Sequence, residues 1–133
     1  MPATRPDAAR PSVLLMLVRE GDRLGGILSD GRGIGLHAQT PLAPLAHLQT
    51  LSDRLTGPDD PARRQAFGRR LHDELLPLAV RQTLARLGPC DLTLQLAPDL
   101  AGLRWELAHD GEAHLDERHA VARRLIDGHA SEA

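Results

Sequence analysis

The chain has 133 residues, a formal net charge of −2 and 41% hydrophobic residues, so its length allows one domain with one core. Acidic and basic residues are interspersed, which argues against nucleic-acid binding, because that function needs a clustered basic face. No apolar run approaches the roughly 18 residues that cross a bilayer, and the first residues lack an apolar signal core. With its single cysteine, the chain is therefore expected to be a cytoplasmic protein without a membrane partner.

The first part of the chain is predicted to be a β-meander. Residues 1–11 contain three prolines and are expected to form a flexible arm. The continuous apolar run within 12–20 is typical of a strand that is covered on both faces. A second strand is predicted over 24–29 and a third over 33–38. The Asp-Gly pair at 30–31 is a favourable hairpin turn between them, because glycine tolerates positive φ.

A helix is predicted next, because leucines recur every three to four residues over 42–55. The Thr-Pro pair at 40–41 offers an N-cap and a first helical residue, unless Pro44 delays the start. The Gly-Pro pair at 57–58 is expected to end this helix.

Two further helices are predicted on either side of a proline. The Asp-Pro pair at 60–61 indicates the start of the first of them. Pro77 lacks an amide donor and is expected to break or kink this helix. A second segment follows over 78–87, and the Gly-Pro pair at 88–89 ends it.

The last third of the chain is predicted to return to strands. Three leucines alternate with polar residues, as in a half-buried strand: Leu92, Leu94 and Leu96. Trp105 and Leu107 are expected to begin another strand, which turns at the Asp-Gly pair at 110–111. Residues 121–126 form a last helix or strand, and 128–133 a frayed tail. The predicted fold class is α+β, with one domain over 12–127.

This order of elements resembles the amino-terminal section of CHAT domains, the caspase-like and separase-like relatives of cysteine peptidases common in bacteria. Three stretches carry the resemblance, which covers most of residues 13–126: Arg-Leu-His-Asp-Glu-Leu-Leu-Pro at 70–77, the strand at 92–99, and Leu-Arg-Trp-Glu-Leu at 103–107. The last is similar to the family's Pro-Trp-Glu-Leu, with Arg104 in place of proline. The resemblance implies a partial caspase-like α/β fold. It assigns structural or interaction roles to Trp105, Glu106 and Leu107, together with the three leucines of the strand.

No catalytic residue, metal or cofactor is predicted. The family's catalytic histidine and cysteine stand in His-Gly and Ala-Cys contexts, and this sequence contains neither. Cys90 precedes the leucine strand, where a small buried thiol is expected rather than a nucleophile. His109, His114 and His119 are five residues apart, a spacing that matches no recurrent zinc motif. We therefore expect them to be surface histidines.

Three functions remain open. The first is a non-catalytic module, a protein-interaction or structural subunit of a bacterial defence or regulatory system. Its exposed sheet edge would pair with a protein partner or form a homo-oligomer. The alternative is one chain of a two-piece or processed caspase-like cysteine protease, whose His and Cys lie on another polypeptide. The third is an unrelated α+β adaptor, favoured if no sheet joins residues 92–97 to the Trp105 segment.

Overall fold

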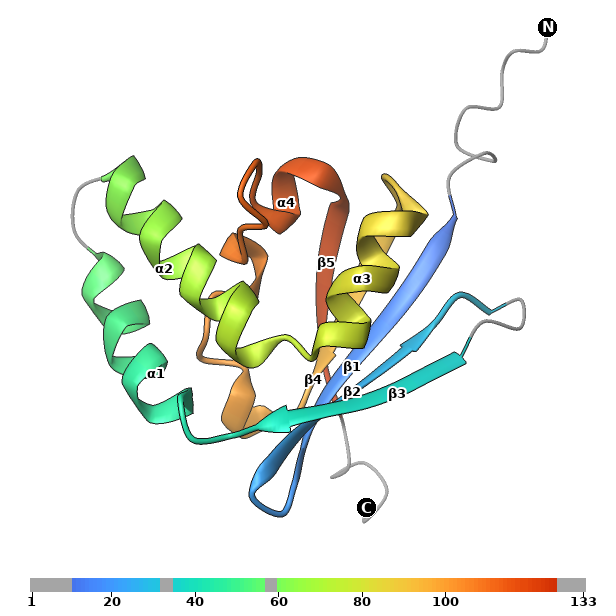
Figure 1. The fold of residues 1–133 in the computed structure, drawn as a ribbon, viewed down its shortest axis with the longest axis horizontal. Coiled ribbons are helices and arrows are strands. Elements are labelled where there is room, and N and C mark those ends of the chain that lie inside the picture. The colour runs from blue at the N-terminus through green and yellow to red at the C-terminus, as the bar shows by residue number, and fades with distance from the viewer. Residues whose placement is uncertain (1–10, 32–34, 57–59, 127–133) are drawn as a thin grey trace, which may run out of the picture.

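The computed structural model describes residues 11–31, 35–56 and 60–126. Its centre is a five-stranded sheet with the strand order β3-β2-β1-β4-β5. The strands are β1 (Ser12–Glu20), β2 (Arg23–Ser29), β3 (Gly35–Pro41), β4 (Asp91–Leu96) and β5 (Ala120–Leu125). The helices lie on one face of this sheet, which gives two layers (Figure 1). The predicted α+β class is confirmed.

The first three strands form the predicted β-meander, since β1 pairs with β2 and β2 with β3, both antiparallel. Gly21 turns the chain between β1 and β2 at a φ of 70°, which favours glycine. Gly31 begins the next turn at a φ of 74°, and residues 32–34 lie outside the described part. The arm at 1–11, apart from Pro11, and the tail at 128–133 also lie outside it.

One expectation about β1 is wrong. Its inward side chains are buried, whereas those of the opposite face are only half-buried: Leu14, Met16 and Val18. A continuous apolar run therefore does not mean two covered faces here. The outer face of β1 tolerates apolar residues because β1 lies in the middle of the sheet, where β2 and β4 on either side partly shield its side chains from water.

The last two strands extend the sheet in parallel. β4 pairs with β1 and β5 pairs with β4, both in parallel. Parallel pairing needs a long connection, and the chain between β1 and β4 contains β2, β3 and the first three helices. The predicted leucine strand is confirmed, and its three leucines are each 1% exposed beneath the helices. The uncertain element at 121–126 is a strand, and it lies at the end of the sheet.

The first helix, α1 (Leu45–Asp53), starts later than the Thr-Pro signal suggested. Thr40 and Pro41 are still paired with β2, and the Leu42 amide then donates to the carbonyl of Asp22 at 3.1 Å. Sheet pairing thus outweighs the local helix signal, and Pro44 marks the actual start. A 3-10 turn, η3 (Arg54–Thr56), follows the helix.

The other two long helices agree with the sequence. α2 (Pro61–Leu75) is capped by Asp60, whose carboxylate accepts from the Arg63 amide at 3.2 Å. Pro77 separates it from α3 (Leu78–Leu87), and Gly88 ends α3 at a φ of 72°. α2 and α3 lie on the same face of the sheet (Figure 1), and each buries apolar side chains, among them Phe67 and Leu71 in α2 and Val80 and Leu84 in α3. Among the described residues, no helix is long and apolar enough to cross a membrane.

The chain between β4 and β5 forms turns rather than the predicted strand. It contains two 3-10 turns, η4 (Pro98–Leu100) and η5 (Trp105–Leu107), and the short helix α4 (Leu115–Arg118). An isolated bridge pairs His109 with His114 around the Asp-Gly turn, as that turn signal indicated. This segment packs beside α2 and leads into β5 (Figure 1).

Candidate functional site

Trp105 is a core residue in a tight turn and not part of a strand. Its side chain is 1% exposed, and its indole N–H donates to the Leu100 carbonyl at 2.8 Å. The amides of Leu107 and Ala108 bond back to the carbonyls of Arg104 and Trp105 at 3.0 Å, which closes the 3-10 turn. The sheet therefore does not join residues 92–97 to this segment, and that favours the α+β adaptor among the three readings.

Glu106 instead connects the turn to the edge strand through Arg123 of β5. The Arg123 guanidinium forms two bonds to the Glu106 carboxylate, through Nε and through Nη2 at 2.9 Å. Its remaining N–H groups donate to two backbone carbonyls, that of Ala101 at 2.7 Å and that of Leu103. One planar guanidinium thus holds β5 against the segment at 101–106, and its bidentate contact with Glu106 is one that lysine cannot reproduce.

The charge state of Glu106 follows from this contact. Burial alone would raise the pKa of Glu106, but the hydrogen bonds and the positive charge of Arg123 outweigh burial and hold this pKa below its ordinary value. The carboxylate is thus ionised and occupied near neutral pH. Its contacts make it a structural clamp rather than a proton donor or acceptor.

The structure brings the predicted site residues together only in part. The leucines of β4 and Trp105 lie in one core, whereas Leu107 is half-buried and packs at its edge. Glu106 faces away from the core toward β5. The sequence analysis gave no role to Arg123, which stands next to Arg124 in the chain. The strand alternation that separates Arg123 from Arg124 is the signal that could have distinguished them.

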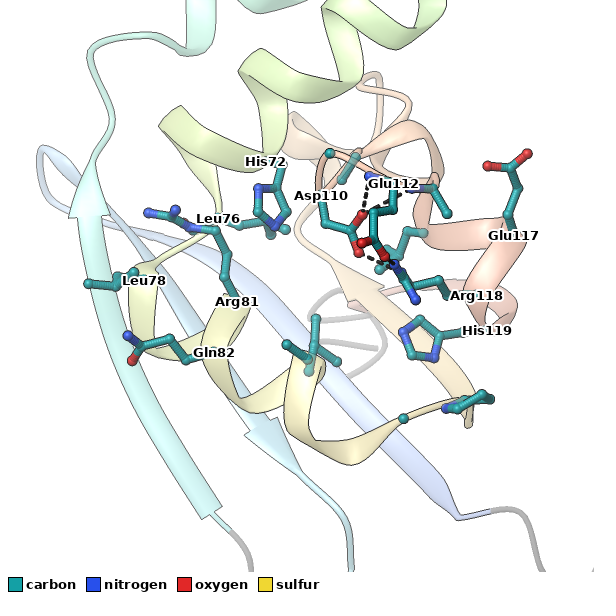
Figure 2. A pocket seen from close by; sticks show the side chains of 18 residues that line it. His72, Leu76, Leu78, Arg81, Gln82, Asp110, Glu112, Glu117, Arg118 and His119 are labelled. Atoms are coloured by element: carbon teal, nitrogen blue, oxygen red, sulfur yellow. Dashed lines mark hydrogen bonds and ion pairs between the residues drawn. The ribbon is translucent and has the colours of Figure 1, made fainter.

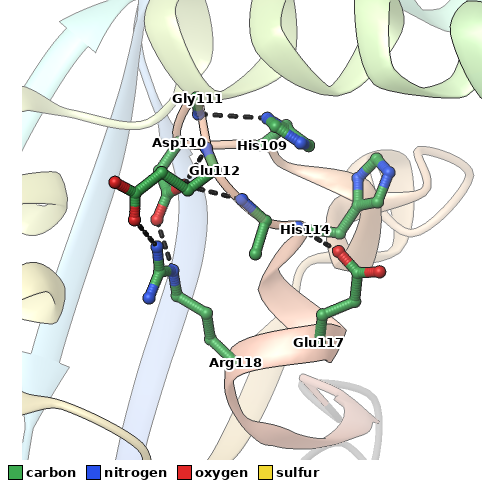
Figure 3. Close-up of polar contacts among 8 residues, drawn as sticks. His109, Asp110, Gly111, Glu112, His114, Glu117 and Arg118 are labelled. Carbon is green, nitrogen blue, oxygen red and sulfur yellow. Dashed lines mark hydrogen bonds and ion pairs between the residues drawn. The ribbon is translucent and has the colours of Figure 1, made fainter.

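The loop between η5 and β5 is held by a polar cluster, the Asp110 cluster, formed by Asp110, Glu112, Ala113 and Arg118 (Figure 3). The Asp110 carboxylate accepts from the amides of Glu112 and Ala113 at 2.8 and 3.0 Å and from the Arg118 guanidinium. Arg118 also donates to Glu112 at 2.8 Å. Burial would raise the pKa of Asp110, but these donors lower it to about 2.

We predict that this cluster makes stability depend on acid pH. The pKa of Asp110 falls from an ordinary 3.8 to about 2 on folding, so its contribution is complete above pH 3.8 and is lost as the pH falls toward 2. Because the side chain is 32% exposed, we expect the loss to be about 1 kcal/mol after solvent screening. Urea denaturation of the wild type and of Asp110→Asn between pH 2 and 6 measures it.

The control for this prediction is Asp53→Asn, an exposed carboxylate in α1. The Asp110→Asn protein should be less stable than the wild type at pH 6 and nearly equal to it at pH 2. If the free energies of unfolding of Asp110→Asn and of the wild type changed in parallel with pH, the role given to Asp110 would be contradicted.

The three spaced histidines are not all surface residues, which corrects the sequence prediction. His109 and His119 are each 5% exposed, and the His114 ring meets that of His109 edge-on at 4.7 Å. The bridge around the Asp-Gly turn joins His109 to His114, and His119 lies against Cys90; linear spacing reveals neither contact. Burial, and then the charge of His114, lower the pKa of His109. Within the described ranges, no three His, Cys, Asp or Glu residues are placed to hold a metal ion.

Cys90 lies beside His119, a pairing that the sequence did not suggest. The thiol is 0% exposed, and its Sγ is 3.4 Å from His119 Nδ1. The same Nδ1 accepts a hydrogen bond from the Cys90 amide at 3.2 Å, so it contacts both the thiol and the backbone of Cys90. A nucleophile needs an approach path and a nearby oxyanion pocket. The complete burial of the thiol favours a structural role for it.

A pocket of about 920 Å³ opens between α3 and the segment that carries the Asp110 cluster (Figure 2). Arg81 and Leu78 lie on its α3 side, and Arg118 and His119 on the opposite side. Its described lining contains no hydroxyl, thiol or lysine side chain. Its three carboxylates already have partners, since Asp110 and Glu112 are bonded to Arg118 and Glu117 accepts the His114 amide. The pocket therefore presents no nucleophile with an adjacent base.

The edge of the sheet at β5 is the most exposed apolar feature outside this pocket. Leu125 is 54% exposed, one of two large hydrophobic side chains described as exposed, and the other is Leu78. The amides of Ala120 and Ile126 donate to carbonyls on the β4 side, at 3.1 and 2.8 Å. Because successive residues alternate, the backbone groups of Val121, Arg123 and Leu125 point to the open side.

Comparison with known proteins adds no relative. No protein-family model, no curated protein and no solved structure matches this chain. Any function must therefore be argued from the site itself.

Proposed function

We propose that this chain is a non-catalytic protein-interaction module that accepts a strand from another polypeptide at β5. The observation that carries the proposal is a parallel edge strand with three outward-facing residues and an exposed Leu125. Exposed edges of this kind pair readily with extended chains. An added strand would bond to the open backbone groups and cover the leucine.

The other edge strand is a poorer acceptor. α3 contacts β3, so the inward side of that edge is covered. On the outer side of β3, His37 and Gln39 are bonded to the Glu20 carboxylate from β1 (3.0 and 2.5 Å). Hydrogen bonds from Gln39 and then from His37 lower the pKa of Glu20. The edge at β5 is thus the better candidate.

The resemblance to CHAT domains extends to the order of the elements but not to the Trp105 segment, which lies in a turn and not in a strand of the sheet. The described order of meander, helices and Pro-broken pair is the order that suggested the resemblance. In the alternative, a two-piece cysteine protease, a second chain bearing His and Cys would complete the sheet. Peptide cleavage by the purified pair, and not by this chain alone, would distinguish that alternative. A cytoplasmic location fits a chain with one cysteine.

A matched pair of variants tests strand acceptance at β5. Leu125→Ala and Leu125→Pro both remove the exposed leucine, but only proline removes an amide that points to the open side. Peptides of eight random residues, displayed on phage, are selected on the wild type and then titrated against both variants. We expect binding to fall at least about tenfold more for proline than for alanine, since one lost edge hydrogen bond is worth about 1 kcal/mol and the altered strand weakens its neighbours.

The control is the stability of both variants, measured by urea denaturation, because proline at a free edge amide should leave the fold intact. Peptides that bind the two variants equally, or that bind without involving β5, would refute strand acceptance.

A further inference from the structure

The charges on β5 distinguish between the possible partners. Strand alternation places Arg123 on the helix-covered face, where Glu106 and two carbonyls occupy it. Arg124 points to the opposite face and is exposed. Among the described residues it has no ion pair, and its row across the sheet is uncharged or remote: Gln95, Met16, Ile27 and His37. One uncompensated cation therefore lies directly at the open edge.

A second copy of this chain fits that edge badly. A closed dimer needs a two-fold axis, so β5 would pair antiparallel with itself. Outward residues must then face outward residues, and the two registers that pair most of Ala120–Leu125 are centred on Ala122 and on Arg123. The register centred on Ala122 places Leu125 beyond the partner's strand, opposite His119, and leaves it poorly covered.

The register centred on Arg123 does cover Leu125, because it places that leucine opposite Val121. It also places Arg123 opposite its own copy and brings the two Arg124 side chains to diagonal positions. Like charges that face each other across strands are destabilising. Of these two registers, the one that buries the exposed leucine is therefore the one that opposes the arginines.

We infer that the strand accepted at β5 comes from a different polypeptide and carries an acidic residue next to an apolar one. This inference rests on the proposed function. The apolar residue lies opposite Leu125 on the helix-covered face, and the Asp or Glu lies opposite Arg124 on the open face. A small residue suits the position opposite Arg123, whose guanidinium is already bound. The cross-strand ion pair selects the partner, and the backbone bonds supply most of the affinity.

The test is a charge reversal applied to the peptide selection. The random eight-residue phage library is selected in parallel on the wild type, on Arg124→Glu and on Arg124→Gln. On the wild type we expect Asp or Glu to be enriched beside an apolar position, and on Arg124→Glu we expect Lys or Arg there. Replacing that acid by its amide in a selected peptide should weaken binding to the wild type by about two- to fivefold, as a cross-strand charge pair allows. The same replacement in the peptide should leave its binding to Arg124→Gln unchanged.

Each other result overturns the inference. Strands without charge preference, selected on all three proteins, would leave strand acceptance standing and refute the acidic partner. Stronger binding of all strands to Arg124→Gln would show that Arg124 only blocks the edge. A wild-type dimer that depends on concentration and is lost in Leu125→Pro would identify a second copy as the partner. Peptides that do not distinguish Leu125→Pro from Leu125→Ala would refute the proposed function itself.

Discussion

Replacing Gly68 by alanine is expected to destabilise the protein by about 3 kcal/mol, because it would overpack a rigid contact. Alanine is the better helix former by about 1 kcal/mol, so helix propensity predicts the opposite sign. A Cβ at Gly68 would lie 2.0 Å from the Leu107 carbonyl oxygen and 3.1 Å from the His109 Cβ. The Gly68 carbonyl also accepts the His109 amide at 2.9 Å, so α2 and the segment that follows η5 cannot separate without losing that bond.

Urea denaturation of Gly68→Ala checks this prediction. Ala66→Gly, at an exposed position of the same helix, measures helix propensity alone and should cost about 1 kcal/mol. Gly102→Ala, where an added Cβ meets nothing within 4 Å, should change little. A Gly68→Ala protein that is more stable than the wild type would show that α2 does not lie against the Trp105 turn.

Replacing Arg123 by alanine is the second substitution with a large expected effect. It would remove the guanidinium that donates to the Glu106 carboxylate and to the carbonyls of Ala101 and Leu103. The pair is partly exposed, with 33% of the Arg123 and 26% of the Glu106 side chain accessible. We therefore expect a loss of about 2 kcal/mol, below the value for a fully buried pair. Amide exchange should accelerate first in β5.

Arg124→Ala is the matched control, because it removes an arginine side chain at the next residue, which points to the opposite, exposed face. Its stability should stay within about 0.5 kcal/mol of the wild type. Arg123→Lys should recover only part of the loss, because a lysine cannot form the bidentate contact. Equal effects of Arg123→Ala and Arg124→Ala would refute the clamp between η5 and β5.

The elements that the sequence predicted are those with local causes. Asp60 and Pro77 act within one helical turn, and the alternation of leucines in β4 depends only on strand geometry. The start of α1 was misplaced because the pairing of Thr40 with β2 is a contact between segments that are distant in sequence. The caps and helix periods on which the prediction relied depend only on neighbouring residues, so they carry no information about such a contact.

The candidate site depended more strongly on distant contacts. Trp105 and Leu107 were predicted to begin a strand, yet they lie in a 3-10 turn that packs against α2, a helix whose nearest end is 30 positions earlier. The pairing of Cys90 with His119 joins residues 29 positions apart. Arg123 is bonded and Arg124 is exposed because β5 is a strand at the sheet edge, which sends the two side chains to opposite faces. The sequence alone did not decide between a strand and a helix there.

The most direct test of strand acceptance is amide hydrogen exchange in β5, measured by NMR with and without a peptide selected on the wild type. The outward amides of Val121, Arg123 and Leu125 should become protected on binding, whereas those of Ala122 and Arg124, which already face β4, should change little. The same peptide should protect none of them in Leu125→Pro. Unchanged outward amides in β5, with protection elsewhere in the chain, would contradict the proposal that this edge receives a partner strand.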